Sequence, residues 1–169
     1  MMDAERNSVC EGWIDAHKAI LFKVARVYGA THADREDLFQ EIALQVWHSV
    51  EAYRGDCAAT TWIYRVALNT ALAWRRKERK HGEGRQDIEA VTGLLIAPSG
   101  RDPRLEWIYQ RIAELDDANR SLALLMLDGF SYREMSQILG LGESNVGMKI
   151  NRIKVALAAQ LAKEEHHGL

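Results

Sequence analysis

Apolar residues recur along most of this chain at intervals of three and four residues, without a strand-length run in which Val, Ile or Thr alternates with polar residues. Intervals of three and four bring side chains onto one face of an α-helix, whereas a half-buried strand needs an apolar side chain at every second position. Hairpin turns between such alternating runs are missing as well. The sequence therefore predicts an all-α protein.

Helix-breaking residues separate the expected helices into two groups. The two prolines of the chain, Pro98 and Pro103, lie close together, and several glycines share the same stretch. Both residue types interrupt helices. We therefore expect two small helical domains, residues 1–80 and residues 104–169, joined by a flexible linker at residues 81–103.

Capping residues and glycines indicate where the helices begin and end. Asp116 is placed to cap one helix, and Ser131 with Glu134 has the spacing of a capping box. Gly29 and Gly55 are stop signals for the first two helices. The expected helices cover about residues 11–28, 34–53, 60–80, 103–114, 116–128, 131–139 and 143–162.

The formal net charge of −2 conceals two basic blocks. Residues 60–82 carry 6 basic side chains and 1 acidic one, and residues 131–163 carry 5 and 2, whereas residues 1–59 and 83–130 each have a net charge of −4. The total alone argues against a nucleic-acid partner. Two basic blocks in acidic surroundings are instead typical of a protein that holds an anion at two separate places.

The last two expected helices have the spacing of a helix-turn-helix, because only Gly140, Leu141 and Gly142 separate them. The stripe that must face the core consists of Val146, Ile150, Ile153 and Leu157. The opposite face carries mostly hydroxyl, amide and basic groups, which can bond base edges and phosphates. Its residues are Ser144, Asn145, Met148, Lys149, Asn151 and Arg152. The alternative is an ordinary helical hairpin with a solvated polar face.

The helix expected at residues 60–80 has a polar stripe on an otherwise largely apolar surface. The stripe consists of Trp62, Arg65, Asn69, Ala73, Arg76 and Lys80, which fall within an arc of about 80°. An aromatic ring, an amide and a row of cations make a platform for unstacked bases. The alternative is a basic helix end that complements the helix dipole, with Trp62 in the core.

The second expected helix is acidic at its start, where Asp34, Asp37 and Glu41 follow one another at helical spacing. The helix dipole stabilises acids near a helix N-terminus, and this is sufficient reason for some of them. The three acids nevertheless place like charge on like charge. An acidic face of this kind suits a protein partner that carries Arg and Lys.

Several function classes are excluded at this stage. The sequence contains no run of 18 or more apolar residues, which a membrane-spanning helix needs, and the charged start lacks an apolar signal core. Cys10 and Cys57 are far apart and read as reduced thiols of a cytoplasmic protein. The histidines are scattered, and no nucleophile–base pair or set of metal ligands is evident. We therefore expect no enzymatic activity, no cofactor and no metal.

Three stretches, residues 34–47, 53–69 and 115–157, resemble parts of the sigma-70-type sigma factors. The first resembles their polymerase-binding helix, the second the segment that melts the promoter and reads its −10 element, and the third the domain that reads the −35 element. The resemblance covers about residues 11–80 and 104–161. Because only these two domains are present, the chain resembles the extracytoplasmic-function group, or group 4.

The resemblance implies an alternative sigma factor that binds core RNA polymerase and directs promoter-specific initiation, without catalytic chemistry of its own. The second helix would bind a coiled coil in the clamp of the largest polymerase subunit through Asp37, Gln40 and Glu41, with Asp34 and Leu38 in support. The residues implied at the −10 element are Arg54, Thr60, Thr61, Trp62, Arg65, Asn69, Arg76 and Arg79. The polar face of the last helix would read the −35 element of promoter DNA. An anti-sigma factor is a further implied partner.

Two positions depart from the family pattern, which usually has Thr in place of Asn145 and a basic residue in place of Gly147. The alternative function is a helix-turn-helix regulator that acts without polymerase. Such a protein needs the C-terminal domain but neither the acidic helix nor the polar stripe, and it usually dimerises to match two half-sites.

Overall fold

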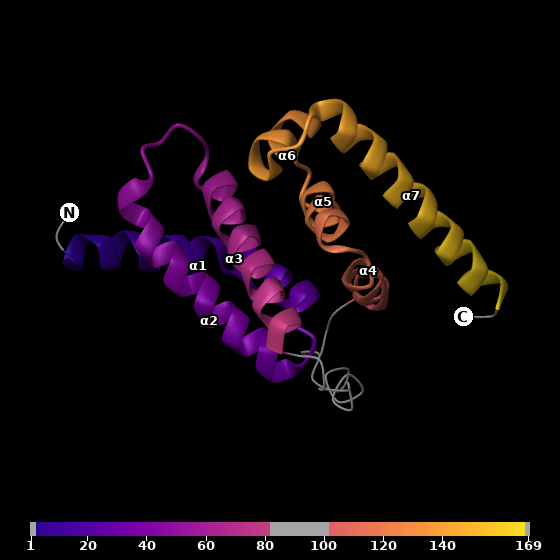
Figure 1. Cartoon of the computed structure of the whole chain (residues 1–169), viewed down its shortest axis with the longest axis horizontal. Helices are drawn as coiled ribbons and strands as arrows, with labels where there is room; N and C mark the ends of the chain where they lie inside the picture. The colour runs from indigo at the N-terminus through magenta and orange to yellow at the C-terminus, as the bar shows by residue number, and fades with distance from the viewer. Residues whose placement is uncertain (1–2, 82–101, 168–169) are drawn as a thin grey trace. The chain divides into compact units, whose positions relative to one another are not determined.

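A computed structural model describes residues 3–81 and 102–167. Within these ranges the chain forms seven α-helices and one short 310 turn, and no strand, so the all-α prediction is confirmed (Figure 1). The chain divides into two compact units, residues 1–106 (unit 1) and residues 107–169 (unit 2). Most of the expected linker, residues 82–101, lies outside the described residues.

Unit 1 contains α1 (Asp3–Tyr28), α2 (His32–Ser49), the 310 turn η1 (Val50–Ala52) and α3 (Ala59–His81). The three helices pack on one another, with α2 running back along α1 (Figure 1). Their shared core is fully buried and includes Leu21, Val24, Leu38, Ile42, Ile63 and Leu68. Burying such side chains contributes about 1.5–3 kcal/mol each, which makes this core the main stabilising feature of the unit.

Helix α1 begins at Asp3, well before the expected start near residue 11, and it is kinked at His17 (φ −127°, ψ 15°). The first turns are largely polar in sequence, which concealed them from a search for apolar periodicity. Cys10 is nevertheless buried, at 3% exposure. Tertiary packing, rather than local sequence preference, therefore supports this part of the helix.

The turn between α1 and α2 is closely packed around Gly29. A Cβ atom on this residue would lie 2.9 Å from the carbonyl oxygen of Ala25 and 2.9 Å from the backbone nitrogen of Arg35. Thr31 caps α2 through a capping box with Asp34, so the helix begins at His32 rather than at Asp34 as expected. The other end also differs, because the 310 turn replaces the last helical turn expected before Tyr53.

Unit 2 includes most of α4 (Pro103–Ala113), followed by α5 (Asp117–Leu127), α6 (Tyr132–Leu139) and α7 (Glu143–His166). Helices α5 and α6 both pack on α7. The predicted caps are confirmed, because Asp116 accepts a hydrogen bond from the backbone of Asn119 at 2.9 Å and Ser131 forms a capping box with Glu134. Gly140 ends α6 at a φ of 69°, a left-handed conformation that favours glycine.

None of the helices in residues 3–81 and 102–167 is both long enough and apolar enough to cross a membrane.

Candidate functional site

The exposed surface of α2 is acidic and lies over a buried apolar face. Asp37 and Gln40 are exposed, and Glu41 is half-buried and accepts a hydrogen bond from the side-chain amide of Gln45 at 3.0 Å. Asp34 is half-buried and belongs to the capping box, where its carboxylate accepts a hydrogen bond from the Thr31 backbone at 3.3 Å. Asp34 therefore has a structural role, whereas Asp37 and Gln40 are available to a partner.

One residue of the predicted polymerase contact requires correction. Leu38 is 0% exposed and belongs to the core with Ile42 and Val46, four and eight positions further along the helix. Its side chain therefore supports the surface from below and does not form part of it. Leu44 was not predicted, although it is 48% exposed and shares a helix face with Asp37, Gln40 and Glu41.

The arginine in the first turns of α2 does not neutralise this surface. The Nε atom of Arg35 donates a hydrogen bond to the carbonyl oxygen of Gly29 at 3.1 Å, which turns the side chain toward the α1–α2 turn. Burial, followed by the charge of Arg26, lowers the pKa of Arg35. Arg35 therefore does not cover the carboxylate of Asp37, which is exposed.

Four of the six residues of the polar stripe predicted on α3 are exposed. Asn69, Ala73, Arg76 and Lys80 are exposed, and Arg65 is half-buried. The opposite face holds the buried residues Ile63, Tyr64, Ala67, Leu68 and Ala71. The predicted contact Arg79 is also exposed. The stripe therefore presents an amide and several cations along one side of a helix whose other side is core.

Thr61 is the exception among the predicted −10 residues. Its side chain is only 7% exposed, so it is a core residue rather than a surface contact. Its spacing from Tyr64 and Leu68, three and seven positions later, places it on the buried face of α3. Thr60 is half-buried and Arg54 is exposed, so both remain accessible at the start of the helix.

Trp62 is half-buried at the start of α3 and is held in a defined orientation. Its ring nitrogen donates a hydrogen bond to Oγ of Ser49 at 3.0 Å. Its ring lies 5.6 Å from the ring of Tyr53, with the two planes inclined at 55°. The ring is therefore neither fully in the core nor free in solution. Its position lies between the two alternatives from the sequence, a core residue and an exposed platform for bases.

The loop between η1 and α3 is stabilised by a residue that the sequence did not identify as part of the site. The hydroxyl of Tyr53 donates a hydrogen bond to the carbonyl oxygen of Cys57 at 2.6 Å and so bridges the loop. On its other side, the ring of Tyr53 lies edge-on to Trp13 of α1, with centroids 5.0 Å apart. The loop is thus connected both to α1 and to Trp62 through one tyrosine.

The helix-turn-helix predicted in the C-terminal region is present, formed by α6, a turn at Gly140 to Gly142, and α7. The predicted reading face is open, because Ser144, Asn145, Met148, Asn151 and Arg152 are exposed, while Lys149 is half-buried. The predicted core stripe holds for its first three members, Val146, Ile150 and Ile153, which are buried. Its fourth member, Leu157, is only half-buried, since α7 continues past the core to His166.

Gly147 lies on α7 beside the reading face. A Cβ atom there would lie 3.4 Å from the ring of Tyr132, which is itself 43% exposed. This is close to ordinary contact distance, and an exposed ring can shift. The fold therefore does not require glycine at this position.

No group of three or more His, Cys, Asp or Glu residues in the described part of the chain is arranged to hold a metal ion. Burial, with a further contribution from Glu11, raises the pKa of the Cys10 thiol.

Two family models match the chain on either side of the undescribed segment. Sigma-70 region 2 matches residues 13–81 and Sigma-70, region 4 matches residues 105–157. The chain is 28% identical over 160 residues to the RNA polymerase sigma factor NccH of Alcaligenes xylosoxydans xylosoxydans, covering 90% of this chain and 86% of NccH. It is 26% identical over 141 residues to the ECF RNA polymerase sigma-E factor of Escherichia coli K12, covering 73% and 72%.

Two solved structures have a similar fold. CnrH in complex with the cytosolic domain of CnrY has a TM-score of 0.67 at 21% identity, covering 95% of both chains. The sigma factor RpoE in complex with the anti-sigma factor NepR, from Bartonella quintana, has a TM-score of 0.67 at 19% identity, covering 84% of this chain and 89% of RpoE.

Proposed function

This chain belongs to the extracytoplasmic-function group of the sigma-70 family and directs transcription initiation as a sigma factor, and we propose that three surfaces divide that task. The acidic face of α2 binds core RNA polymerase, the polar stripe of α3 with the preceding loop reads the single-stranded −10 element, and α7 reads the −35 duplex. The observation that carries the proposal is the order of three exposed surfaces with different chemistry: acidic, then aromatic and basic, then amide and basic.

The polymerase surface consists of Asp37, Gln40, Glu41 and Leu44 on one face of α2. Carboxylates at the edge of an interface attract a basic partner and suppress wrong partners. Leu44 contributes exposed apolar area at the same place, which can pack on an apolar side chain of the partner. The contact is proposed with the clamp coiled coil of the largest polymerase subunit.

The −10 surface brings together an exposed amide, cations and a half-buried aromatic ring. Unstacking a base costs a few kcal/mol, so the protein must return this free energy by stacking and hydrogen bonds. Asn69 supplies a donor and an acceptor for a base edge, while Trp62 supplies part of a ring face. Arg54, Arg76 and the other exposed cations are proposed to hold the phosphates.

The −35 surface is the exposed face of α7, which carries a hydroxyl, two asparagine amides and Arg152. The first turns of such a helix enter the major groove, where amides and cations discriminate between base pairs. Met148 is 56% exposed in the middle of this face and offers an apolar contact for a thymine methyl group.

We also propose that the chain acts without catalytic chemistry of its own, in the cytoplasm where sigma factors meet RNA polymerase. An anti-sigma factor is the proposed regulator, holding the chain inactive by covering its polymerase- and DNA-binding surfaces. The similarity in fold to CnrH, solved with the cytosolic domain of CnrY, and to RpoE, solved with NepR, supports this proposal.

The experiment that separates this function from that of a polymerase-independent regulator is a binding assay with purified core RNA polymerase. The chain is first sized by gel filtration and then mixed with core enzyme. A monomer that joins core polymerase supports the proposal. A stable dimer that binds duplex DNA but ignores core polymerase contradicts it and favours the regulator.

A further inference from the structure

The part of α1 before the kink, residues 3–16, is called here the N-terminal arm. It extends beyond the match to Sigma-70 region 2, which begins at residue 13. Arg6, Cys10 and Trp13 occur at intervals of four and three and therefore share one face of the arm. That face is held by the far end of α2, the 310 turn and the start of the loop before α3, as the following contacts show.

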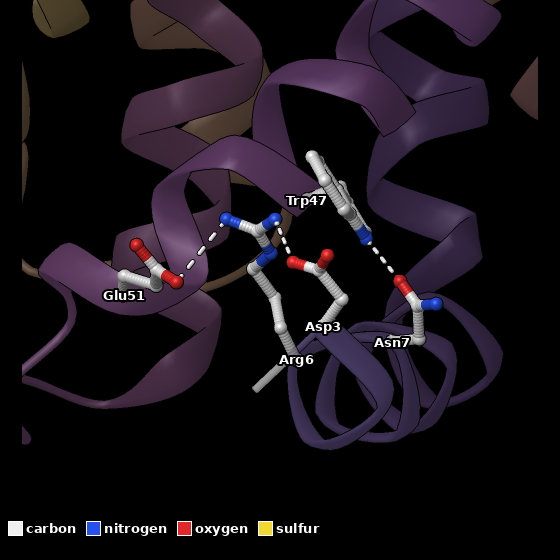
Figure 2. Close-up of polar contacts among 5 residues, drawn as sticks. All are labelled: Asp3, Arg6, Asn7, Trp47 and Glu51. Atoms are coloured by element: carbon white, nitrogen blue, oxygen red, sulfur yellow. Dashed lines mark hydrogen bonds and ion pairs between the residues drawn. The ribbon is translucent and has the colours of Figure 1, made fainter. Parts of the chain in front are cut away.

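Arg6 is the first anchor of the arm (Figure 2). Its guanidinium carbon lies 3.7 Å from the centre of the Trp47 ring, and its side chain is only 15% exposed. The same guanidinium forms ion pairs with Asp3 at 2.8 Å and with Glu51 of the 310 turn at 3.2 Å. A cation–π contact strengthens when water is excluded from it, so this anchor is stronger than a surface ion pair.

Trp47 is bound from a second side. Its ring nitrogen donates a hydrogen bond to the side-chain oxygen of Asn7 at 2.5 Å (Figure 2). Two consecutive residues of the arm therefore contact Trp47: Arg6 lies over the face of the ring, and Asn7 accepts a hydrogen bond at its edge. The arm is fixed to the end of α2 rather than projecting into solvent.

Trp13 is the second anchor, one turn before the kink. Its ring lies edge-on to Tyr53, with centroids 5.0 Å apart and planes at 81°. Tyr53 in turn spans the loop through its hydrogen bond to the Cys57 carbonyl at 2.6 Å and faces the Trp62 ring at 5.6 Å. A continuous set of contacts therefore runs from the arm through Tyr53 to both the loop and Trp62.

We infer that the N-terminal arm is a positioning element for −10 recognition: Arg6 fixes the arm to the end of α2, Trp13 packs on Tyr53, and Tyr53 holds the loop at residues 53–58 in the form that receives the single strand. This inference rests on the function proposed for α3 and its loop. A loop that is already ordered avoids the ordering cost that binding otherwise incurs. Correct placement also sharpens discrimination, because a base contact depends on the position of its partner groups. Neither Arg6 nor Trp13 needs to touch DNA.

The test uses the full chain assembled with core polymerase and a single-stranded non-template oligonucleotide that carries the −10 element of a promoter found by transcription in vitro. Affinity is measured for this oligonucleotide and for versions with one base replaced. The readout is the discrimination ratio, which is the affinity for the −10 sequence divided by the affinity for a version with one base replaced. A poorly folded variant lowers the active fraction equally for all oligonucleotides and leaves the ratio unchanged. The ratio therefore distinguishes positioning from general support of the fold.

The variants are Arg6→Gln, Trp13→Leu and Tyr53→Phe, and the last removes only the hydroxyl that bridges the loop. Lys18→Gln is the matched control, because it removes one positive charge from an exposed position on the same helix. We expect the three variants to lower the discrimination ratio about 3- to 10-fold, and Trp13→Phe, which keeps a ring against Tyr53, to restore most of it. Core binding and the control ratio should match the wild type.

An unchanged ratio in Arg6→Gln and Tyr53→Phe, beside a wild type that discriminates, would overturn the inference while leaving the proposed function in place. A wild-type holoenzyme that binds all the oligonucleotides equally would remove the proposed −10 function, and the inference with it.

Discussion

The Nε atom of Arg35 donates a hydrogen bond to the carbonyl oxygen of Gly29 at 3.1 Å, and the same two residues approach so closely that a Cβ atom on Gly29 would lie 2.7 Å from Cγ of Arg35. This contact closes the turn between α1 and α2. It also draws the arginine away from the acidic face of α2. The close packing at Gly29 therefore helps to keep the positive charge of Arg35 away from the proposed polymerase surface.

Gly29→Ala should lower the free energy of unfolding by about 1–3 kcal/mol, because the added methyl group meets backbone atoms that cannot move aside. Gly12→Ala is the matched control, since a Cβ atom there meets nothing within 4 Å. Relief of the helix penalty of glycine should make Gly12→Ala more stable by about 0.5–1 kcal/mol. Urea unfolding followed by tryptophan fluorescence measures both, because only Trp107 of the five tryptophans lies in unit 2. Equal stability of the two variants would contradict the described packing at Gly29.

The double substitution Asp37→Arg with Glu41→Arg should weaken binding to core polymerase strongly while leaving the fold intact. Two attractive charges become two repulsive ones at the proposed interface, where like-charge contacts cost several kcal/mol. Glu11→Arg with Asp15→Arg makes the same change in charge at two exposed positions with the same spacing on α1. Normal holoenzyme assembly by the α2 variant in a pull-down would mean that these acids only stabilise the N-terminal turns of α2.

Asn69→Ala should weaken open-complex formation by about 1–3 kcal/mol, which is the range of a base-specific contact. Binding to core polymerase should not change, because Asn69 is exposed on α3 and lies outside the proposed polymerase face. Permanganate footprinting of the melted region measures the effect. Gln160→Ala removes an exposed amide near the end of α7 and serves as control. An Asn69 variant as active as this control does not contact the strand.

Arg152→Ala should weaken holoenzyme binding to a −35 duplex and reduce the dependence of log affinity on log salt by about one if the contact is to phosphate. Lys163→Ala provides the comparison, because it removes an exposed cation three turns further along the same helix. Fluorescence anisotropy at several salt concentrations measures the slope. Equal slopes for the two variants would place Arg152 outside the interface.

Helical periodicity predicted the architecture well where apolar spacing was regular. The capping box at Ser131 and the turn at Gly140 are confirmed, and four of the six residues of the α3 stripe are exposed. These features are local, because each depends on residues within a few turns of one another.

Two residues that the family resemblance implied at the proposed site belong to the core. Leu38 and Thr61 lie within motif segments, and both are buried. Leu38 is followed by Ile42 four residues later, and Thr61 precedes Tyr64 by three residues. Those intervals were visible in the sequence and assign both residues to the core.

The contacts of the N-terminal arm were beyond sequence reasoning. Arg6 and Trp47 are far apart in the chain, as are Trp13 and Tyr53, and each pair meets only when α1 packs against α2 and the segment that follows it. The spacing of apolar residues along the sequence does not indicate contacts between residues so far apart. The polar first turns of α1 also hid the helix itself, since its stability comes from these tertiary partners.

Transcription in vitro shows whether this chain gives core RNA polymerase promoter specificity. Core polymerase, the purified chain and fragmented genomic DNA are incubated with nucleotides, and the RNA 5′ ends are sequenced. We expect start sites that require the chain and share two upstream elements, with the upstream element lost in Arg152→Ala reactions and melting at the downstream element impaired by Asn69→Ala. The same start sites with and without the chain would mean that it does not act as a sigma factor.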